Sequence, residues 1–256
     1  MGRDEASIIL GSLTHVGMVR EANQDAYLVR LAPKAPAGAD ALLAVADGMG
    51  GHPAGDVASD MAIKGLVSIL SSSNDSEGVE NWGVLLGKAI TQVNADVFKA
   101  AMMPDKRSMG TTLTAVVVAG TTLTIGHVGD SRAYVLRAGH FHQVTTDHSW
   151  VAEQVTSGKL SPEAADVHPD RNVLTRAVGT TLQLEVEVLA LELREGDTLL
   201  LCSDGLHSLV SDEDVARILI GLDPVAAAQA LVDRANKLGG DDNVTVIVAR
   251  MERLAK

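Results

Sequence analysis

The chain is poor in cysteine, in aromatic side chains and in positive charge. The single cysteine, Cys202, cannot form an internal disulfide and lies in an apolar run, as a buried thiol of a reducing compartment would. Aromatic residues make up 2%, and 21 Lys+Arg against 33 Asp+Glu give a formal net charge of −12. The chain therefore lacks the basic surface and the stacking platforms of a nucleic-acid-binding protein.

No apolar run approaches the roughly 18 residues of a membrane span, and the first residues lack the apolar stretch of a signal peptide. We expect a cytoplasmic protein with neither a membrane nor a nucleic-acid partner.

Short apolar or β-branched segments and glycine-containing turns predict antiparallel β-structure. Ala119-Gly120 and Ala138-Gly139 separate successive strand-like segments, which favours hairpins. The predicted strands are 41–46, 112–118, 122–125, 132–137, 141–144, 184–191, 198–202 and 244–249. Apolar residues at helical spacing predict helices over 63–70 and 86–97, and helix-capping residues predict two more, starting at Ser211 and Asp223-Pro224. The pattern indicates an α+β fold, and we expect one domain over residues 1–256.

Aspartates recur where these strands end. Asp47 and Asp204 directly follow apolar runs and precede glycine, and Asp130 follows the segment 125–129. Asp242 precedes the strand 244–249, and Asp25 precedes the mixed apolar stretch 26–31. A single Asp-Gly is usually a turn, but several carboxylates at strand ends suit a hard divalent cation, because such ions prefer oxygen ligands.

Eight motifs in a fixed order carry a family resemblance. They are REANQD (20–25), VADGMGGH (45–52), GTT (110–112), VGDSRAY (128–134), TDH (146–148), LTRAVG (174–179), SDGL (203–206) and DNVTVIV (242–248). In these motifs the chain resembles the metal-dependent serine/threonine protein phosphatases of type 2C, particularly their compact bacterial members. The resemblance implies a central β-sandwich of two antiparallel sheets flanked by helices on both faces, a four-layer αββα arrangement. It also implies a flap at about 149–172.

The same resemblance implies a metal site. Its ligands for two Mn²⁺ or Mg²⁺ ions would be Asp47, which bridges them, the Gly48 carbonyl, Asp204 and Asp242. Asp130, with Asp204, matches a third and weaker metal site of bacterial relatives. Gln24 and Asp25 match positions that contact metal-bound waters.

The implied reaction is hydrolysis of phosphoserine and phosphothreonine in proteins, without a phospho-enzyme. Two metal ions would activate a water for in-line attack, and Arg20 would bind the phosphate through its planar guanidinium. Met49 stands where animal relatives have a histidine, so we expect a metal-bound water as the proton donor, with His52 as the weaker alternative. We expect a monomer whose substrates come from a cognate serine/threonine kinase.

Two other functions compete with this interpretation. A pseudophosphatase would bind phosphoproteins without hydrolysis, but Arg20, Asp47, Asp204 and Asp242 are all retained. A receiver-like domain phosphorylated on aspartate would need parallel β-α alternation, which the predicted hairpins contradict.

Overall fold

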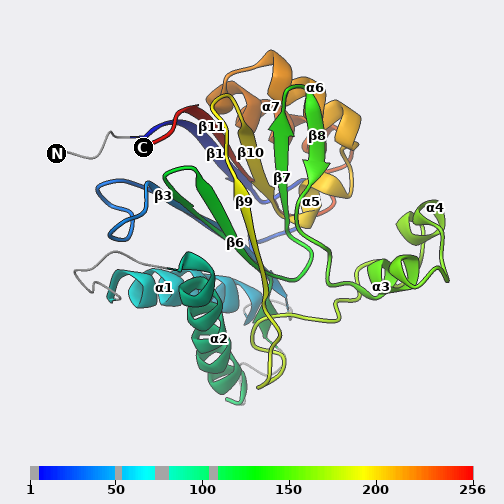
Figure 1. Ribbon diagram of the computed structural model, residues 1–256. Coiled ribbons are helices and arrows are strands. Elements are labelled where there is room, and N and C mark those ends of the chain that lie inside the picture. Colours follow the sequence, from blue (N-terminus) through cyan, green and yellow to red (C-terminus); the bar gives the residue numbers. More distant parts are fainter. Residues whose placement is uncertain (1–5, 50–53, 73–80, 104–108, 256) are drawn as a thin grey trace.

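Two antiparallel sheets form the centre of the molecule (Figure 1). The structure is a computed structural model and describes residues 6–49, 54–72, 81–103 and 109–255. The first sheet has the strand order β1 (Ser7–His15), β11 (Val244–Arg253), β10 (Thr198–Cys202), β7 (Arg132–Arg137), β8 (His140–Gln143). The second has the order β2 (Asp25–Leu31), β3 (Ala41–Met49), β5 (Leu113–Ala119), β6 (Thr122–Val128), β9 (Glu187–Glu192), and β4 (Gly110–Thr111) pairs with β3.

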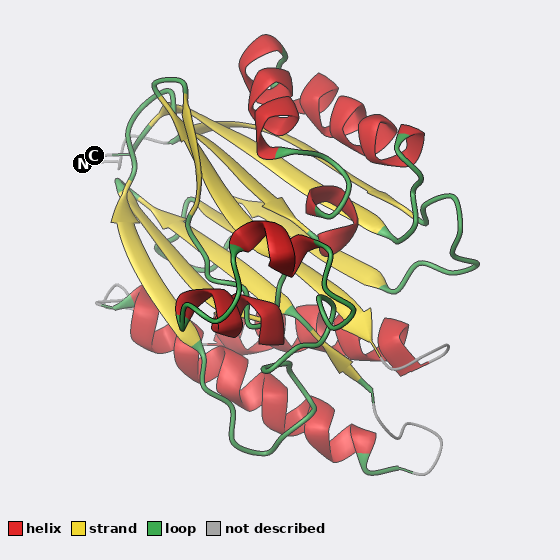
Figure 2. Ribbon diagram, turned by 90° about the vertical axis from the view of Figure 1, so that its right-hand side faces the viewer, coloured by secondary structure: helices red, strands yellow, loops and turns green. Residues whose placement is uncertain are grey.

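Helices cover the outer face of each sheet (Figures 1 and 2). The second sheet packs against α1 (Ala54–Ser72) and α2 (Trp82–Ala101), and the first against α5 (Asp204–His207), α6 (Asp212–Gly221) and α7 (Pro224–Lys237). This arrangement confirms the predicted four-layer α+β sandwich. Every strand pairing in the part of the chain that the structure describes is antiparallel, which rules out the receiver-like alternative for this fold.

The apolar run of β3 is explained by its burial on both faces. Leu43 and Val45 point into the layer between the two sheets. Leu42 and Ala44 point into the layer beneath α1 and α2. Because neither face meets water, the strand has no polar alternation and reads as a continuous apolar segment. The strand is thereby held rigidly up to Asp47 near its end.

Turn and cap residues act as the sequence predicts. The hairpin between β7 and β8 has positive φ at both central residues, Ala138 (49°) and Gly139 (83°), as a type I′ turn requires. The Ser211 hydroxyl accepts a hydrogen bond from the Asp214 N–H at the start of α6. The Asp223 carboxylate caps the first turn of α7 in the same way.

The strand predictions are incomplete at β1, β2, β4 and β9. The strands β1, β2 and β4 were not predicted, and the pairing of β1 with β11 is visible only in the fold. The strand β9 begins at Glu187 and not at Leu184, because Leu184 and Val186 pack against the helical layer of the second sheet instead of pairing.

Two short helices, α3 (Trp150–Thr156) and α4 (Pro162–Asp166), stand away from both sheets (Figure 1). Both lie within 149–172, the segment expected to form a flap. The Ser149 hydroxyl caps α3 by accepting from the Ala152 N–H. Within the described ranges, no helix combines the length and the apolar character needed to cross a membrane.

Candidate functional site

Five aspartates from both sheets come together at one end of the sandwich. Asp25 begins β2 and lies opposite Asp47 in the register of β2 and β3. Asp204 opens α5 directly after β10, Asp242 directly precedes β11, and Asp130 lies in the turn after β6. Besides burial, the charges of the other four carboxylates raise the pKa of Asp47, so all five share one electrostatic environment. The sequence pattern of strand-end aspartates therefore corresponds to a single cluster.

Burial is the main cause of the raised pKa values in this cluster. It raises the pKa of Asp25 to about 7, against the lowering effect of hydrogen bonds from Thr245 and Ser203. It raises the pKa of Asp130 to about 8, with the Asp204 charge as the next cause. The pKa of Asp204 is raised by burial and by Asp242, and its carboxyl group lies within hydrogen-bonding reach of Asp47. Ionised together, these groups repel one another unless a cation offsets their charge.

Three buried polar atoms at this end have no hydrogen-bond partner among the described residues. They are Asp25 Oδ1, Asp204 Oδ1 and Gln24 Nε2. Buried polar groups are normally paired, so two carboxylate oxygens left without a donor need a different partner. Oxygen ligands of this kind fit a divalent cation or the waters around one. The residues present thus fit the metal site that the sequence suggests.

Arg20 lies at the edge of the cluster and pairs with Asp242. Its Nη2 donates to Asp242 Oδ2 at 2.7 Å, and their side chains are 54% and 35% exposed. This hydrogen bond and the Asp242 charge raise the pKa of Arg20, with smaller contributions from Asp204 and Asp47. A half-exposed guanidinium beside buried carboxylates can meet an anion arriving from solvent.

Gly48 follows Asp47 at a point where other backbone segments approach closely. A Cβ added at Gly48 would lie 2.1 Å from the Gly55 carbonyl oxygen and 2.7 Å from that of Gln24. The Gly48 N–H donates to the Gln24 carbonyl at 3.1 Å. Met49 ends β3, and His52, the alternative proton donor, lies outside the described residues. Only glycine fits at position 48 without moving the backbone.

Buried hydroxyl groups hold the aspartates in place, and this role was not predicted from the sequence. Ser203 and Thr245 donate to Asp25 Oδ2 at 2.7 and 2.6 Å. Thr112 Oγ1 accepts from the Asp47 N–H at 2.9 Å, and Thr111 Oγ1 donates to the Asp47 carbonyl at 2.9 Å. The available signal was a polar residue inside an apolar strand, as at Thr245 in β11, where a buried side chain must find a partner.

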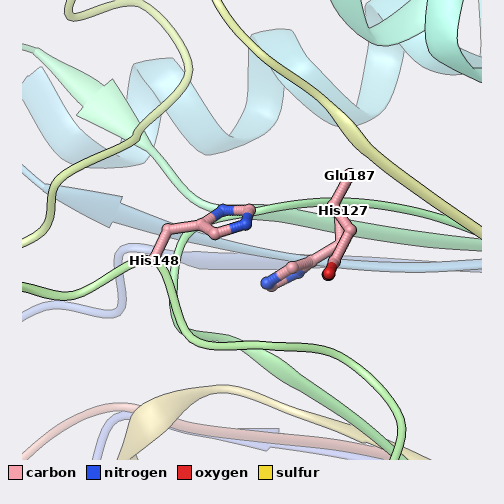
Figure 3. Close-up of side chains that lie close together, drawn as sticks. All are labelled: His127, His148 and Glu187. Carbon is pink, nitrogen blue, oxygen red and sulfur yellow. The ribbon is translucent and has the colours of Figure 1, made fainter. Parts of the chain in front are cut away.

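His127, His148 and Glu187 form a second cluster (Figure 3), in which His148 lies two residues before α3. One potential ligand atom from each residue lies within 4.8 Å of the others. Burial lowers the pKa of His127 to about 3 and that of His148 to about 4, so both rings are neutral at pH 7.

The nitrogens of this cluster are already engaged. His127 Nε2 lies 3.1 Å from the Thr146 carbonyl, and its Nδ1 lies 2.8 Å from Thr114 Oγ1. His148 Nδ1 accepts from the Gly129 N–H at 3.1 Å, and the guanidinium of Arg176 lies 3.4 Å from its Nε2. A neutral ring has only one acceptor nitrogen, and a neighbouring cation opposes a metal ion. The cluster therefore fits a packed polar link between β6 and the residues directly before α3.

Known proteins resemble this chain over most of its length. A sequence model described as protein phosphatase 2C matches residues 18–238. The serine/threonine protein phosphatase PstP of Mycobacterium tuberculosis is 42% identical over 237 residues, 91% of this chain but 43% of that relative. The chain thus spans less than half of PstP.

Two solved structures are similar over 96% of this chain and the whole of theirs. The S. agalactiae serine/threonine phosphatase has a TM-score of 0.89 at 34% identity. The PstP catalytic domain in complex with two manganese ions has a TM-score of 0.82 at 36% identity.

The strand topology, the aspartate cluster beside Arg20, and a match from Met18 to Leu238 all agree. The chain belongs to the protein phosphatase 2C family.

Proposed function

We propose that this protein is a metal-dependent serine/threonine protein phosphatase. The observation that carries the proposal is the convergence of buried aspartates, two of them with an unpartnered oxygen, beside the half-exposed Arg20. A phosphate monoester is a dianion, and a cluster of carboxylates would repel it unless bound cations reversed the local charge. The names of the relatives, which are serine/threonine phosphatases, support the same reaction.

The cluster divides into ligand roles by position. Asp47, the Gly48 carbonyl, Asp204 and Asp242 would hold two Mn²⁺ or Mg²⁺ ions, as the manganese complex of the PstP domain suggests. Asp130 with Asp204 would form a third, weaker site, and Gln24 and Asp25 would bind metal-coordinated waters through the buried atoms that lack a partner. When bound, such ions acidify water and offset charge on a phosphoryl group.

Arg20 supplies the chain's own contact with the phosphate. Its planar fork can donate to two phosphate oxygens at once and oppose the charge that grows on them during in-line attack by water. No phospho-enzyme is needed in this scheme. Met49 carries no titratable proton, so we propose water as the proton donor for the departing alkoxide, with His52 as the weaker alternative.

The substrate class follows from the ester that this site would cleave. We propose phosphoserine and phosphothreonine proteins as substrates, supplied by a serine/threonine kinase in the cytoplasm and bound by a monomeric enzyme in which residues 1–256 form one domain. The α3–α4 segment stands clear of both sheets, where it can serve as a flap over an arriving protein.

Hydrolysis of p-nitrophenyl phosphate and of phosphothreonine, phosphoserine and phosphotyrosine peptides tests the proposal. We expect turnover with Mn²⁺ or Mg²⁺, none with EDTA, and preference for the first two peptides. The Arg20→Ala variant should lower kcat/KM by about 10- to 100-fold, because one charge-assisted contact with the phosphate is lost. Folded protein that binds a phosphopeptide in the presence of Mn²⁺ without hydrolysing it would instead establish the pseudophosphatase.

A further inference from the structure

The Asn243 side chain joins the start of β11 to the loop that carries Arg20. Its Nδ2 donates to the carbonyl oxygens of Val16 and Ala22, both at 2.9 Å. Its Oδ1 accepts from the Gln24 N–H at 2.8 Å. The residue is 4% exposed, so this amide is paired almost entirely out of water. All three bonds reach residues more than 200 positions earlier in the chain.

These bonds close the loop 16–24 at both of its ends. One bond holds Val16 at the start of the loop, two hold Ala22 and Gln24 at its end, and Arg20 lies between them. Two further contacts come from the same C-terminal segment. The Met18 N–H donates to the Gly240 carbonyl at 2.7 Å, and Arg20 itself pairs with Asp242. The segment 240–243 thus holds the loop through a backbone hydrogen bond, an ion pair and the Asn243 amide. Of these three, only the amide contacts both ends of the loop.

We propose that Asn243 is a positioning residue for phosphate recognition. By fixing the loop 16–24, its amide holds the Arg20 guanidinium at the edge of the aspartate cluster. A long side chain on a mobile loop loses more freedom when it binds an anion, and a loop that is already ordered avoids most of that loss. The inference rests on the proposed function, because it takes phosphate as the ligand of Arg20.

A matched control lies on α2. The Asn94 side chain is fully buried, donates to the carbonyls of Thr181 and Leu182 at 2.9 and 3.3 Å, and accepts from the Gly179 N–H at 2.7 Å. It therefore closes a loop with the same three hydrogen bonds as Asn243, two donated to carbonyls and one accepted from an N–H. That loop does not carry Arg20, so Asn94→Ala reports the effect of losing such a clamp on stability alone.

A double-mutant cycle separates positioning from stability. The variants Asn243→Ala and Asn94→Ala are made alone and together with Arg20→Ala. The Kd of inorganic phosphate is measured by calorimetry on each Mn²⁺-loaded protein, with KM and kcat for p-nitrophenyl phosphate beside it. We expect Asn243→Ala to raise the phosphate Kd about 10-fold and to add less than about twofold once Arg20 is alanine. We expect Asn94→Ala to change the phosphate Kd by less than about twofold, whether position 20 is arginine or alanine.

Other outcomes would overturn the inference. If the fold-increases in phosphate Kd caused by Asn243→Ala and Arg20→Ala multiply in the double variant, then Asn243 does not act through Arg20. The same conclusion follows if Asn94→Ala weakens phosphate binding as much as Asn243→Ala does. Should Asn243→Ala not fold, Asn243→Ser keeps a hydroxyl donor and replaces it in the cycle, with a smaller but still non-additive effect expected. In the wild type, exchange of the Gln24 amide hydrogen as fast as that of an exposed loop amide would also refute the clamp.

The proposed function can fail separately from this inference. Wild-type protein that binds phosphate through Arg20 and Asn243 but hydrolyses no phosphomonoester would contradict only the proposed activity. Wild-type protein that hydrolyses p-nitrophenyl phosphate, with additive losses in the cycle, would contradict only the role of Asn243.

Discussion

Replacing Asp25 by asparagine should stabilise the metal-free protein and make the gain depend on pH. Burial raises the pKa of Asp25 to about 7, from 3.8 for an aspartate exposed to water. Because its folded-state pKa lies above its unfolded-state pKa, the group favours folding less as pH rises through this interval. The raised pKa lowers the free energy of unfolding by about 4 kcal/mol at pH 8, where the group is ionised in both states. At pH 5, where it is ionised only in the unfolded state, the loss is about 2 kcal/mol. Asparagine carries no charge, and its Oδ1 can still accept from Ser203 and Thr245.

The measurement is urea unfolding followed by circular dichroism, in EDTA, at pH 5 and pH 8. We expect Asp25→Asn to unfold at higher urea than wild type, with the larger difference at pH 8. Asp96→Asn, an exposed change on α2, should shift neither midpoint. Mn²⁺ should stabilise the wild type at pH 8 and stabilise Asp25→Asn less, because the carboxylate that favours the cation is gone. A variant less stable than wild type at pH 8, or an equal gain at both pH values, would refute the electrostatic reasoning.

Three further changes test other parts of the structure. Asp204→Asn should lower kcat by about 100-fold or more with circular dichroism unchanged, whereas Asp233→Asn on the exposed face of α7 should keep wild-type turnover. An unaltered rate in Asp204→Asn at every Mn²⁺ concentration would remove Asp204 from the metal site. Gly48→Ala should lose about 3 kcal/mol of unfolding free energy, because its Cβ would lie 2.1 Å from a carbonyl oxygen, while Gly221→Ala meets no atom within 4 Å and should lose none. Ala138→Gly should gain about 0.5–1 kcal/mol, since Ala138 has a φ of 49°, and a lower urea midpoint would contradict the turn assignment.

Local signals in the sequence accounted for much of the fold. The strand β10 was predicted at its observed bounds, and β3 was predicted to within a few residues, because strands buried on both faces are continuous apolar runs. Helix starts at Ser211 and Asp223 were predicted because capping depends on residues only a few positions away. The edge strand β1 was missed, since its place depends on β11, which is more than 200 residues later.

The aspartates and Arg20 were candidate site residues by sequence alone, because their types and motif positions are visible along the chain. What the tertiary structure decided is how they are held. Asp25 owes its raised pKa to burial, and its hydroxyl partners come from β11 and from the residue after β10. The clamp by Asn243 likewise joins the two ends of the chain. Burial and long-range hydrogen bonds are properties of packing, and no local pattern of residues encodes them.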